Sequence, residues 1–357
     1  MATARVEQRL LWQRRQPMGQ VVIEATAPSR IDLAGGTLDI YPLYLFEEGG
    51  LTVNVAITVR SHVRLVTRDD ERIRLVSLDT GVTEEAESIE HLHCGGKLDL
   101  IARAVKFYPP PTGVTIETRN DAPRGSGLGA SSSLLIAVSG ALLRLAGTQL
   151  DVMTMVDYSA NLEAQNVRVP TGKQDYYPAV FGGLNAIWFN VDGNVVESLD
   201  LHGECLQALQ DRLVLCFTGE SRFSGASNWN MLKMYLDDQG TTRANMKAIK
   251  RTALAMREAL ANRDLAWFAE LLDEEWQNRR RLAEGVSTPR IEELMAAARQ
   301  AGALASRTCG AGGGGCMTSF CAEGTASDVC AALEERGATC LPYSIARTGL
   351  DVRVLDD

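Results

Sequence analysis

One stretch constrains this chain more than any other: residues 123–133 read PRGSGLGASSS. Its glycines, Gly125, Gly127 and Gly129, leave the backbone free to enter the left-handed region and to pass close to a ligand. An apolar run, Leu134–Val138, follows at once and is typical of a buried helix. The first N–H groups of a helix have no intrahelical partner and lie at the positive end of the helix dipole. A glycine-rich loop that enters a helix therefore predicts a phosphate site.

Two common phosphate loops do not account for this stretch. The chain has no G-x-x-x-x-G-K-[ST] sequence, which excludes a Walker-type loop. Gly125, Gly127 and Ala130 match G-x-G-x-x-A, but a dinucleotide site needs its glycines directly after a strand and an acid about 20 residues later. Here the polar segment 119–124 comes between, and the next acid after the serines, Asp151, opens a helix. The sequence disfavours a dinucleotide site.

The loop resembles the second motif of the galacto-, homoserine, mevalonate and phosphomevalonate (GHMP) kinases, P-x-x-x-G-L-G-S-S. The chain has Ala130 where the first serine of that motif usually stands. The resemblance implies that Ser131 faces Mg²⁺ and the β,γ-phosphates of ATP. It also implies that the ATP-binding residues of this loop are Pro123, Gly125, Gly127, Leu128, Gly129, Ala130, Ser131 and Ser132.

Two further segments are similar to the first and third motifs of the same family. In residues 27–39, Arg30 falls where those kinases carry a Lys or Arg near the attacked hydroxyl, and Asp39 falls where some carry a sugar-binding aspartate. Residues 310–315 resemble a glycine-rich turn that packs against the phosphate loop. There Gly312 and Gly313 are implied to bind ATP, and Gly313 the acceptor as well. This turn also matches G-x-G-x-x-G, but no helix follows it, so the dinucleotide interpretation fails again.

The stretch 169–185 discriminates most between branches of the family. Gly172-Lys173-Gln174-Asp175, followed by aromatic residues and Phe-Gly-Gly-x-Asn, resembles the branch that contains the heptose phosphate kinases and fucokinases. Glu163 precedes Asp175 by 12 residues, which is also the spacing of that branch. The resemblance implies that Asp175 is catalytic together with Arg30, that Glu163 shares Mg²⁺ with Ser131, and that Gly172 and Lys173 join Asp39 in binding the acceptor.

Each of these residues also has an ordinary structural explanation. Ser131 would cap a helix, Glu163 would lie on a solvated helix face, and Asp175 and Asp39 would belong to turns. Arg30 would be a surface arginine on a strand. Three motifs in the family's order, with Glu163 and Asp175 at the branch spacing, favour the functional explanation.

Composition places the chain among ordinary globular proteins. It has 357 residues, of which 45% are hydrophobic and 23% charged, and no segment approaches the roughly 18 apolar residues of a membrane helix. A formal net charge of −9 argues against a nucleic-acid partner. We expect a cytoplasmic enzyme with a small-molecule partner and no membrane partner. Whether it acts as a monomer or a homodimer stays open.

The eight cysteines form no C-x-x-C pair and no zinc spacing, so we expect reduced thiols. The cluster His91-x-His93-Cys94 lacks the second pair that a zinc site needs. Residues 1–20 carry Arg5, Arg9, Arg14 and Arg15 against one acid, which predicts a disordered or loosely docked N-terminal extension.

The fold that the resemblance implies is α+β with two domains. A ribosomal-S5-like ATP-binding domain would span about 21–190, and a ferredoxin-like domain about 200–357. Alternation predicts separate strands at 51–59 and 61–67, and helical periodicity predicts helices at 244–260 and 264–283. Arg279-Arg280-Arg281 is then interpreted as a solvated helix end, where cations are favoured.

The function that these motifs favour is an ATP- and Mg²⁺-dependent kinase for a sugar or sugar phosphate. The resemblance implies a heptose 7-phosphate or related pyranose, phosphorylated at the anomeric hydroxyl. A non-sugar alcohol kinase of the mevalonate type is the alternative, against which Asp39 and the Gly-Lys-Gln-Asp element argue. A catalytically silent sugar sensor on the same fold is a second one, against which the retained Ser131, Glu163 and Asp175 argue.

Overall fold

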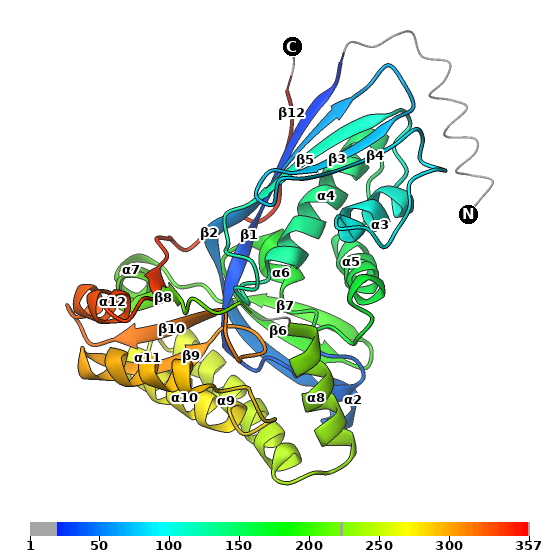
Figure 1. Ribbon diagram of the computed structural model, residues 1–357. Coiled ribbons are helices and arrows are strands. Elements are labelled where there is room, and N and C mark those ends of the chain that lie inside the picture. Colours follow the sequence, from blue (N-terminus) through cyan, green and yellow to red (C-terminus); the bar gives the residue numbers. More distant parts are fainter. Residues whose placement is uncertain (1–19, 222–223, 356–357) are drawn as a thin grey trace.

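The computed structural model describes residues 20–221 and 224–355, which form two β-sheets with helices packed on them (Figure 1). The larger sheet has the order β12-β1-β2-β5-β3-β4, with β6 paired to β2 and β7 to β6. Its strands are β1 (Val22–Ala34), β2 (Gly50–Thr67), β3 (Ile73–Ser77), β4 (Val82–Ala86), β5 (Val114–Asn120), β6 (Leu184–Asn190), β7 (Gly193–Ser198) and β12 (Asp351–Leu355). The expected α+β class is confirmed.

One long strand, β2, replaces the two strands that the alternation predicted at 51–59 and 61–67. It pairs with β1 along its length, while its first half also pairs with β6 and its second half with β5. The register against β1 shifts between Pro28 and Ser29, opposite Arg60 and Ile57. Proline has no N–H for the ladder, so an irregularity at this point is expected. The predicted break is thus a change of partner within one strand.

Helices cover one face of the larger sheet: α3 (Asp99–Phe107), α4 (Ala130–Ala146), α5 (Val152–Val167) and α6 (Tyr176–Phe181) (Figure 1). The central one, α4, lies against β1 and β2 on one side and against α3 and α5 on the other. A helix enclosed in this way must be apolar all round, which explains the run from Leu134 to Val138. The short α2 (Leu43–Phe46) follows β1.

The smaller sheet has the order β11-β8-β10-β9. Its strands are β8 (Leu213–Phe217), β9 (Ala303–Thr308), β10 (Cys316–Cys321) and β11 (Thr339–Cys340), and the helices of this half are α7 (Gly203–Arg212), α8 (Ser224–Leu236), α9 (Thr242–Ala261), α10 (Leu265–Arg279), α11 (Pro289–Gln300) and α12 (Ala326–Glu334). The predicted pair of long helices is confirmed as α9 and α10, which pack on each other (Figure 1). Phe268, Leu272 and Trp276 lie on the buried face of α10.

The last strand, β12, returns to the larger sheet and pairs with β1. The domain boundaries near 190 and 200 therefore stay a prediction, and the structure adds that the end of the chain packs with the first sheet. The predicted N-terminal extension lies outside the described residues except for Gln20. None of the described helices is long and apolar enough to cross a membrane.

The expectation that every cysteine is a reduced thiol is wrong for one pair. Cys330 on α12 and Cys340 on β11 form a disulfide. Ten residues separate them in the chain, which is neither a C-x-x-C nor a zinc spacing, so local sequence carries no signal for it. The pair meets because α12 packs against β11.

Candidate active site

The predicted phosphate loop connects β5 to α4, as its sequence suggested. Gly127 and Gly129 have φ of +72° and +74°, which side chains rarely adopt. A Cβ on Gly127 would lie 2.5 Å from the carbonyl oxygen of Cys309, and one on Gly129 would lie 3.0 Å from the carboxylate of Asp175. Gly129 is also the N-cap of α4 and supplies no side chain to bond the first N–H groups. The start of α4 therefore offers backbone donors to an anion.

The glycine-rich turn at 310–315 packs against this loop, as its resemblance to the third motif implied. The N–H of Cys316 donates to the carbonyl of Ser126 at 2.7 Å. The N–H of Gly310 donates to Oδ1 of Asp32 on β1 at 3.0 Å. The turn thus ties β10 of the smaller sheet to the loop and to β1 of the larger one.

A cavity of roughly 880 Å³ contains the loop, and its lining comes mostly from residues 30–175, with Asn228, Arg279, Gly310 and Ala311 added from the rest of the chain. Most of the predicted site residues line it: Arg30, Asp39, Pro123, Gly125, Gly127, Gly129, Ala130, Ser131, Ser132, Glu163, Gly172 and Asp175. Leu128, Lys173, Gly312 and Gly313 do not line it, whereas Gly310 and Ala311 do. The individual roles of all these residues stay predictions.

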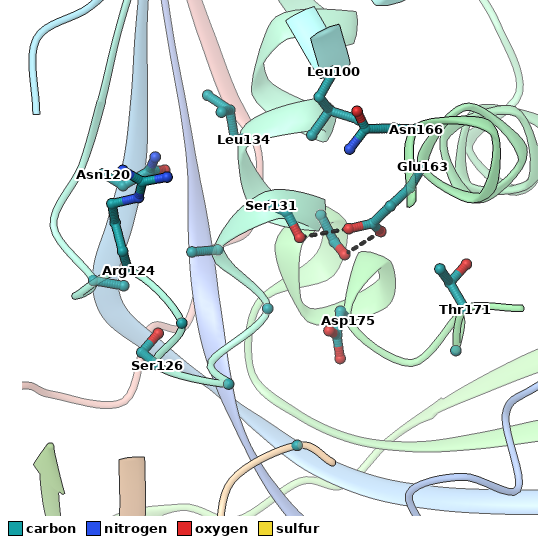
Figure 2. A pocket seen from close by; sticks show the side chains of 18 of the residues that line it. Leu100, Asn120, Arg124, Ser126, Ser131, Leu134, Glu163, Asn166, Thr171 and Asp175 are labelled. Carbon is teal, nitrogen blue, oxygen red and sulfur yellow. Dashed lines mark hydrogen bonds between the residues drawn. The ribbon is translucent and has the colours of Figure 1, made fainter. Parts of the chain in front are cut away.

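At one end of the cavity, the carboxylate of Glu163 is surrounded by hydroxyl groups (Figure 2). Ser131 donates to its Oε1 at 2.5 Å, Ser132 donates to its Oε2 at 3.0 Å, and the Tyr176 hydroxyl donates to Oε2 as well. Burial raises the pKa of Glu163, while these hydroxyls oppose the shift. Oxygen ligands of this kind, few in number and beside a phosphate loop, suit Mg²⁺.

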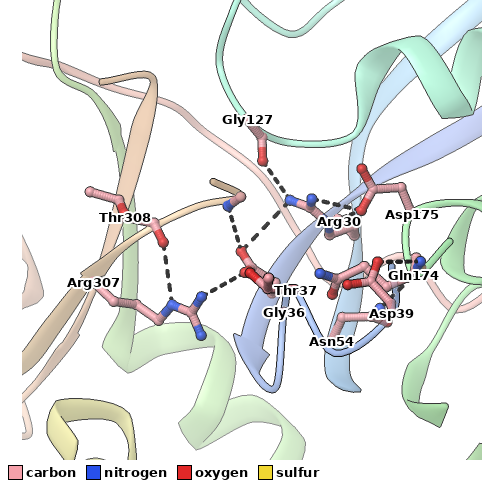
Figure 3. Close-up of polar contacts among 12 residues, drawn as sticks. Arg30, Gly36, Thr37, Asp39, Asn54, Gly127, Gln174, Asp175, Arg307 and Thr308 are labelled. Atoms are coloured by element: carbon pink, nitrogen blue, oxygen red, sulfur yellow. Dashed lines mark hydrogen bonds and ion pairs between the residues drawn. The ribbon is translucent and has the colours of Figure 1, made fainter. Parts of the chain in front are cut away.

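In the middle of the cavity, Arg30 on β1 holds Asp175 at the start of α6 (Figure 3). Its Nε and Nη2 lie 2.8 and 2.6 Å from Oδ1 of Asp175, and its Nη1 donates to the carbonyl of Gly127 at 2.5 Å. Burial raises the pKa of Asp175, and the guanidinium of Arg30 opposes that shift. One arginine therefore connects the phosphate loop with the predicted catalytic carboxylate.

At the other end, Asp39 meets the Gly-Lys-Gln-Asp segment, as the sequence predicted. It is 2% exposed, and its Oδ2 accepts from the N–H of Gln174 at 3.0 Å (Figure 3). A Cβ on Gly172 would lie 2.0 Å from the same oxygen, so only glycine fits there. Burial raises the pKa of Asp39 to about 6.

The structure places Gln174, and not the predicted Lys173, in the lining of the cavity. The ammonium group of Lys173 forms an ion pair with Asp157 on α5 at 2.7 Å, away from the cavity lining. Gln174, to which sequence reasoning gave no role, is 5% exposed and lines the cavity beside Asp39. Nothing in the local sequence indicates which of the two neighbours faces inward.

The interpretation of Arg279 as part of a solvated helix end is wrong. Its side chain is 1% exposed, and it lines the same cavity. Its Nη2 donates to the carbonyl of Gly36 at 2.7 Å, and its Nη1 donates to the Thr37 hydroxyl at 3.3 Å. Thr37 has φ +79°, an unfavourable conformation for a β-branched residue that persists only where neighbours hold it. α10 ends against the loop that carries Asp39, and this tertiary contact buries the arginine.

A buried ion network continues from Arg279 back to Arg30. Glu275 accepts from Arg279 at 2.7 Å, and its other oxygen lies 3.1 Å from Nη1 of Arg307. Nη2 of Arg307 lies 2.6 Å from Asp32, which lies 3.7 Å from Arg30. Burial raises the pKa of Asp32, but the arginines outweigh it and leave that pKa lowered. With Asp175 included, three acids face three arginines, so the formal charges cancel.

Comparisons with known proteins identify the family. The GHMP kinases N-terminal domain model matches residues 97–183, and the GHMP kinases C-terminal model matches residues 256–339. D-glycero-alpha-D-manno-heptose 7-phosphate kinase of Campylobacter jejuni is 34% identical over 304 residues, which cover 84% of this chain and 89% of that protein. Mevalonate kinase of Thermococcus sibiricus is 26% identical over 92% of this chain and 97% of that protein.

Solved structures agree. A D-glycero-D-manno-heptose 1-phosphate kinase from Bacteroides thetaiotaomicron superposes with a TM-score of 0.77 at 25% identity, covering 94% of this chain and all of that one. A putative sugar kinase from Campylobacter jejuni also gives a TM-score of 0.77, at 29% identity, covering 96% of this chain and all of that one. The chain therefore belongs to the GHMP kinase family, with that family's two-domain fold, and is an ATP-dependent kinase.

Proposed function

We propose that this kinase transfers the γ-phosphoryl group of ATP to a sugar or sugar phosphate, a heptose 7-phosphate or related pyranose, at the anomeric hydroxyl. One observation carries the proposal: Arg30 and Asp175 lie between the phosphate loop and the buried carboxylate of Asp39, in one cavity. Support also comes from the heptose phosphate kinases among its relatives.

The nucleotide end of the cavity would hold the phosphates of ATP. The backbone of Gly125–Gly129 and the start of α4 present N–H donors and the positive end of the helix dipole. Ser131 and Glu163 would hold Mg²⁺, which when bound offsets the charge of the β,γ-phosphates. Because Glu163 already accepts from three hydroxyls, its carboxylate keeps one orientation toward Ser131.

Asp175 would act on the acceptor hydroxyl, which must lose a proton as the new P–O bond forms. Arg30 binds one oxygen, Oδ1, which leaves Oδ2 of Asp175 for the acceptor. The same guanidinium would stabilise negative charge that develops on the acceptor oxygen. Phosphoryl transfer needs positioning and charge stabilisation more than covalent chemistry, and this arrangement supplies both.

Asp39 would select the acceptor through its ring hydroxyls. A buried carboxylate that is left without partners is costly, so it rejects molecules that cannot supply hydrogen-bond donors. A pyranose offers neighbouring hydroxyls, whereas mevalonate and homoserine do not. We therefore expect turnover of a pyranose and none of the other two.

An acceptor panel tests this assignment. It contains heptose 7-phosphate, fucose, galactose, mevalonate and homoserine, with the product position read by phosphorus NMR. A sugar phosphorylated at its anomeric oxygen is the expected result. Mevalonate or homoserine turned over as fast as the best sugar would show that the sugar-kinase assignment is wrong. ATP binding with no turnover of any acceptor would favour the silent sensor.

Replacing Asp39 by alanine separates acceptor recognition from ATP binding. Loss of hydrogen bonds to a charged group is typically worth about 1.5–3 kcal/mol, so Asp39→Ala should lower kcat/KM for the sugar roughly 10- to 100-fold. The Kd of ATP, measured without acceptor, should barely change. An equally large weakening of ATP binding would place Asp39 in the nucleotide site instead.

A further inference from the structure

The side chain of Gln174 is the least explained polar group of the cavity. It is 5% exposed and lines the cavity beside Asp39, Thr37 and Arg279. Its backbone is fully committed, because its N–H donates to Asp39 at 3.0 Å and its carbonyl accepts from Nδ2 of Asn54 at 3.2 Å. These two hydrogen bonds hold the main chain of Gln174 and involve neither polar atom of its carboxamide.

The carboxamide itself is not satisfied by the protein. Among the described residues, Oε1 of Gln174 is buried without a hydrogen-bond partner. An unpaired buried polar atom is costly, and the large majority of buried side-chain polar atoms in folded proteins have a partner. A Cβ on Gly36 would lie 2.9 Å from Nε2 of Gln174 and 2.9 Å from Nη2 of Arg279, so the amide nitrogen lies on the side of Gly36 and of this guanidinium. Because the side chain lines the cavity, a hydroxyl group that enters the cavity can supply a partner.

We infer, on the basis of the sugar-kinase function proposed above, that the Gln174 carboxamide binds a hydroxyl group of the acceptor and is a specificity-determining residue. An ionised Asp39 only accepts hydrogen bonds, whereas an amide both donates and accepts. A half-turn about its last single bond exchanges Oε1 and Nε2, so it fits a hydroxyl in either role. Asp39 and Gln174 together bind two hydroxyls of one polyhydroxylated acceptor.

A set of three variants tests this role. Gln174→Met keeps the side-chain size and removes both hydrogen-bonding atoms. Gln174→Glu keeps an acceptor but adds a second charge beside Asp39. Gln207→Met is the matched control, because Gln207 is an exposed glutamine on α7 outside the cavity lining. Each is compared by kcat/KM for the best sugar at saturating ATP, by KM for ATP, and by thermal unfolding.

Gln174→Met should lower kcat/KM for the acceptor about 3- to 10-fold, the range of one lost neutral hydrogen bond, with KM for ATP unchanged. Its Tm should equal or exceed that of the unaltered protein, since no protein partner of Oε1 is lost. Gln174→Glu should lower kcat/KM for the acceptor further, because its carboxylate is repelled by that of Asp39. A residue with only a structural role would instead lower Tm and leave the acceptor kinetics unchanged.

Deoxygenated sugars provide the decisive measurement. For the one deoxy analogue that lacks the bound hydroxyl, kcat/KM of the unaltered enzyme should be about 3- to 10-fold lower than for the parent sugar. Gln174→Met should have the same kcat/KM for that analogue as for the parent sugar. Fully additive losses for every analogue, or acceptor kinetics within twofold of the unaltered enzyme, would overturn the inference while leaving the sugar-kinase function intact. Failure of the unaltered enzyme to phosphorylate any sugar would overturn both.

Discussion

The two ends of the cavity are built in different ways. The proposed nucleotide end includes one continuous segment, 123–133, whose glycines and helix start present backbone groups. The acceptor end is assembled from β1 and the loop after it, from residues 172–175, and from Arg279 at the end of α10. A local chain segment can prepare a phosphate site alone. A site for ring hydroxyls needs side chains from several segments that are distant in the chain.

The acceptor end also depends on how buried charges are paired. Asp32 and Asp39 lie in the same segment, yet their pKa values move in opposite directions. Burial raises both, but Asp32 faces Arg307 at 2.6 Å and ends lowered, whereas the closest polar partner of Asp39 is a backbone N–H and its pKa rises to about 6. Asp32 is held in an ion pair, whereas Asp39 forms no ion pair among the described residues, so we propose that its carboxylate is left for a ligand.

Breaking the buried network should have the largest effect. Arg307→Met would leave Asp32 and Glu275 buried without their shared cation, which typically costs about 3–5 kcal/mol. The free energy of unfolding in urea measures it. Arg299→Met removes an exposed pair with Asp273 and should cost under about 1 kcal/mol. Equal costs for the two variants would refute a special role for the network.

Asp175→Asn should abolish most of the activity without affecting the nucleotide end. We expect kcat to fall on the order of 10²-fold or more, the usual contribution of acid–base help, with the Kd of ATP retained. Single-turnover rates with the best sugar measure it. An unchanged kcat would show that Asp175 only binds Arg30.

Changes at the nucleotide end should alter the Mg²⁺ requirement. Glu163→Gln should raise the Mg²⁺ concentration for half-maximal activity about tenfold, and Ser131→Ala somewhat less, because each removes one oxygen ligand or its charge. Activity titrations with Mg²⁺ at fixed ATP measure the shift. If both variants titrate like the unaltered enzyme, the metal is held elsewhere.

The pH dependence should be the smallest effect and belongs to the acceptor end. With a pKa of about 6, Asp39 is ionised at pH 7 and mostly protonated at pH 5.5, so kcat/KM for the sugar should fall about fourfold across that interval. Asp39→Asn should lack this decline.

Stability should change in the opposite direction over the same range. The pKa of Asp39 is higher in the folded protein than in the unfolded chain. The contribution of Asp39 to the free energy of unfolding is therefore present below about pH 4 and is lost as the pH rises through about 6. Denaturation of the unaltered protein and of Asp39→Asn across pH 4 to 7 checks the sign. A contribution that grows with pH would contradict the raised pKa.

The sequence alone determined the family, the α+β class that the family implies, and the glycine loop that enters a helix. These rest on local features: a glycine loop entering an apolar helix, a glycine-rich turn, and Glu163 and Asp175 twelve residues apart. Backbone conformation and helix capping act within a few residues, so motif and structure coincide there. The long helices α9 and α10 were predicted for the same reason, since periodicity is a local property.

Only the tertiary structure decided which charged and polar side chains line the cavity. Arg279 has the sequence context of a solvated helix end, and it is buried because α10 ends against the loop of Gly36 and Thr37. Lys173 and Gln174 are adjacent, yet one pairs with α5 and the other faces the cavity. Cys330 meets Cys340 because a helix packs on a strand. Such contacts depend on how segments distant in the chain pack together and on the direction in which each side chain turns. Local sequence patterns do not indicate either.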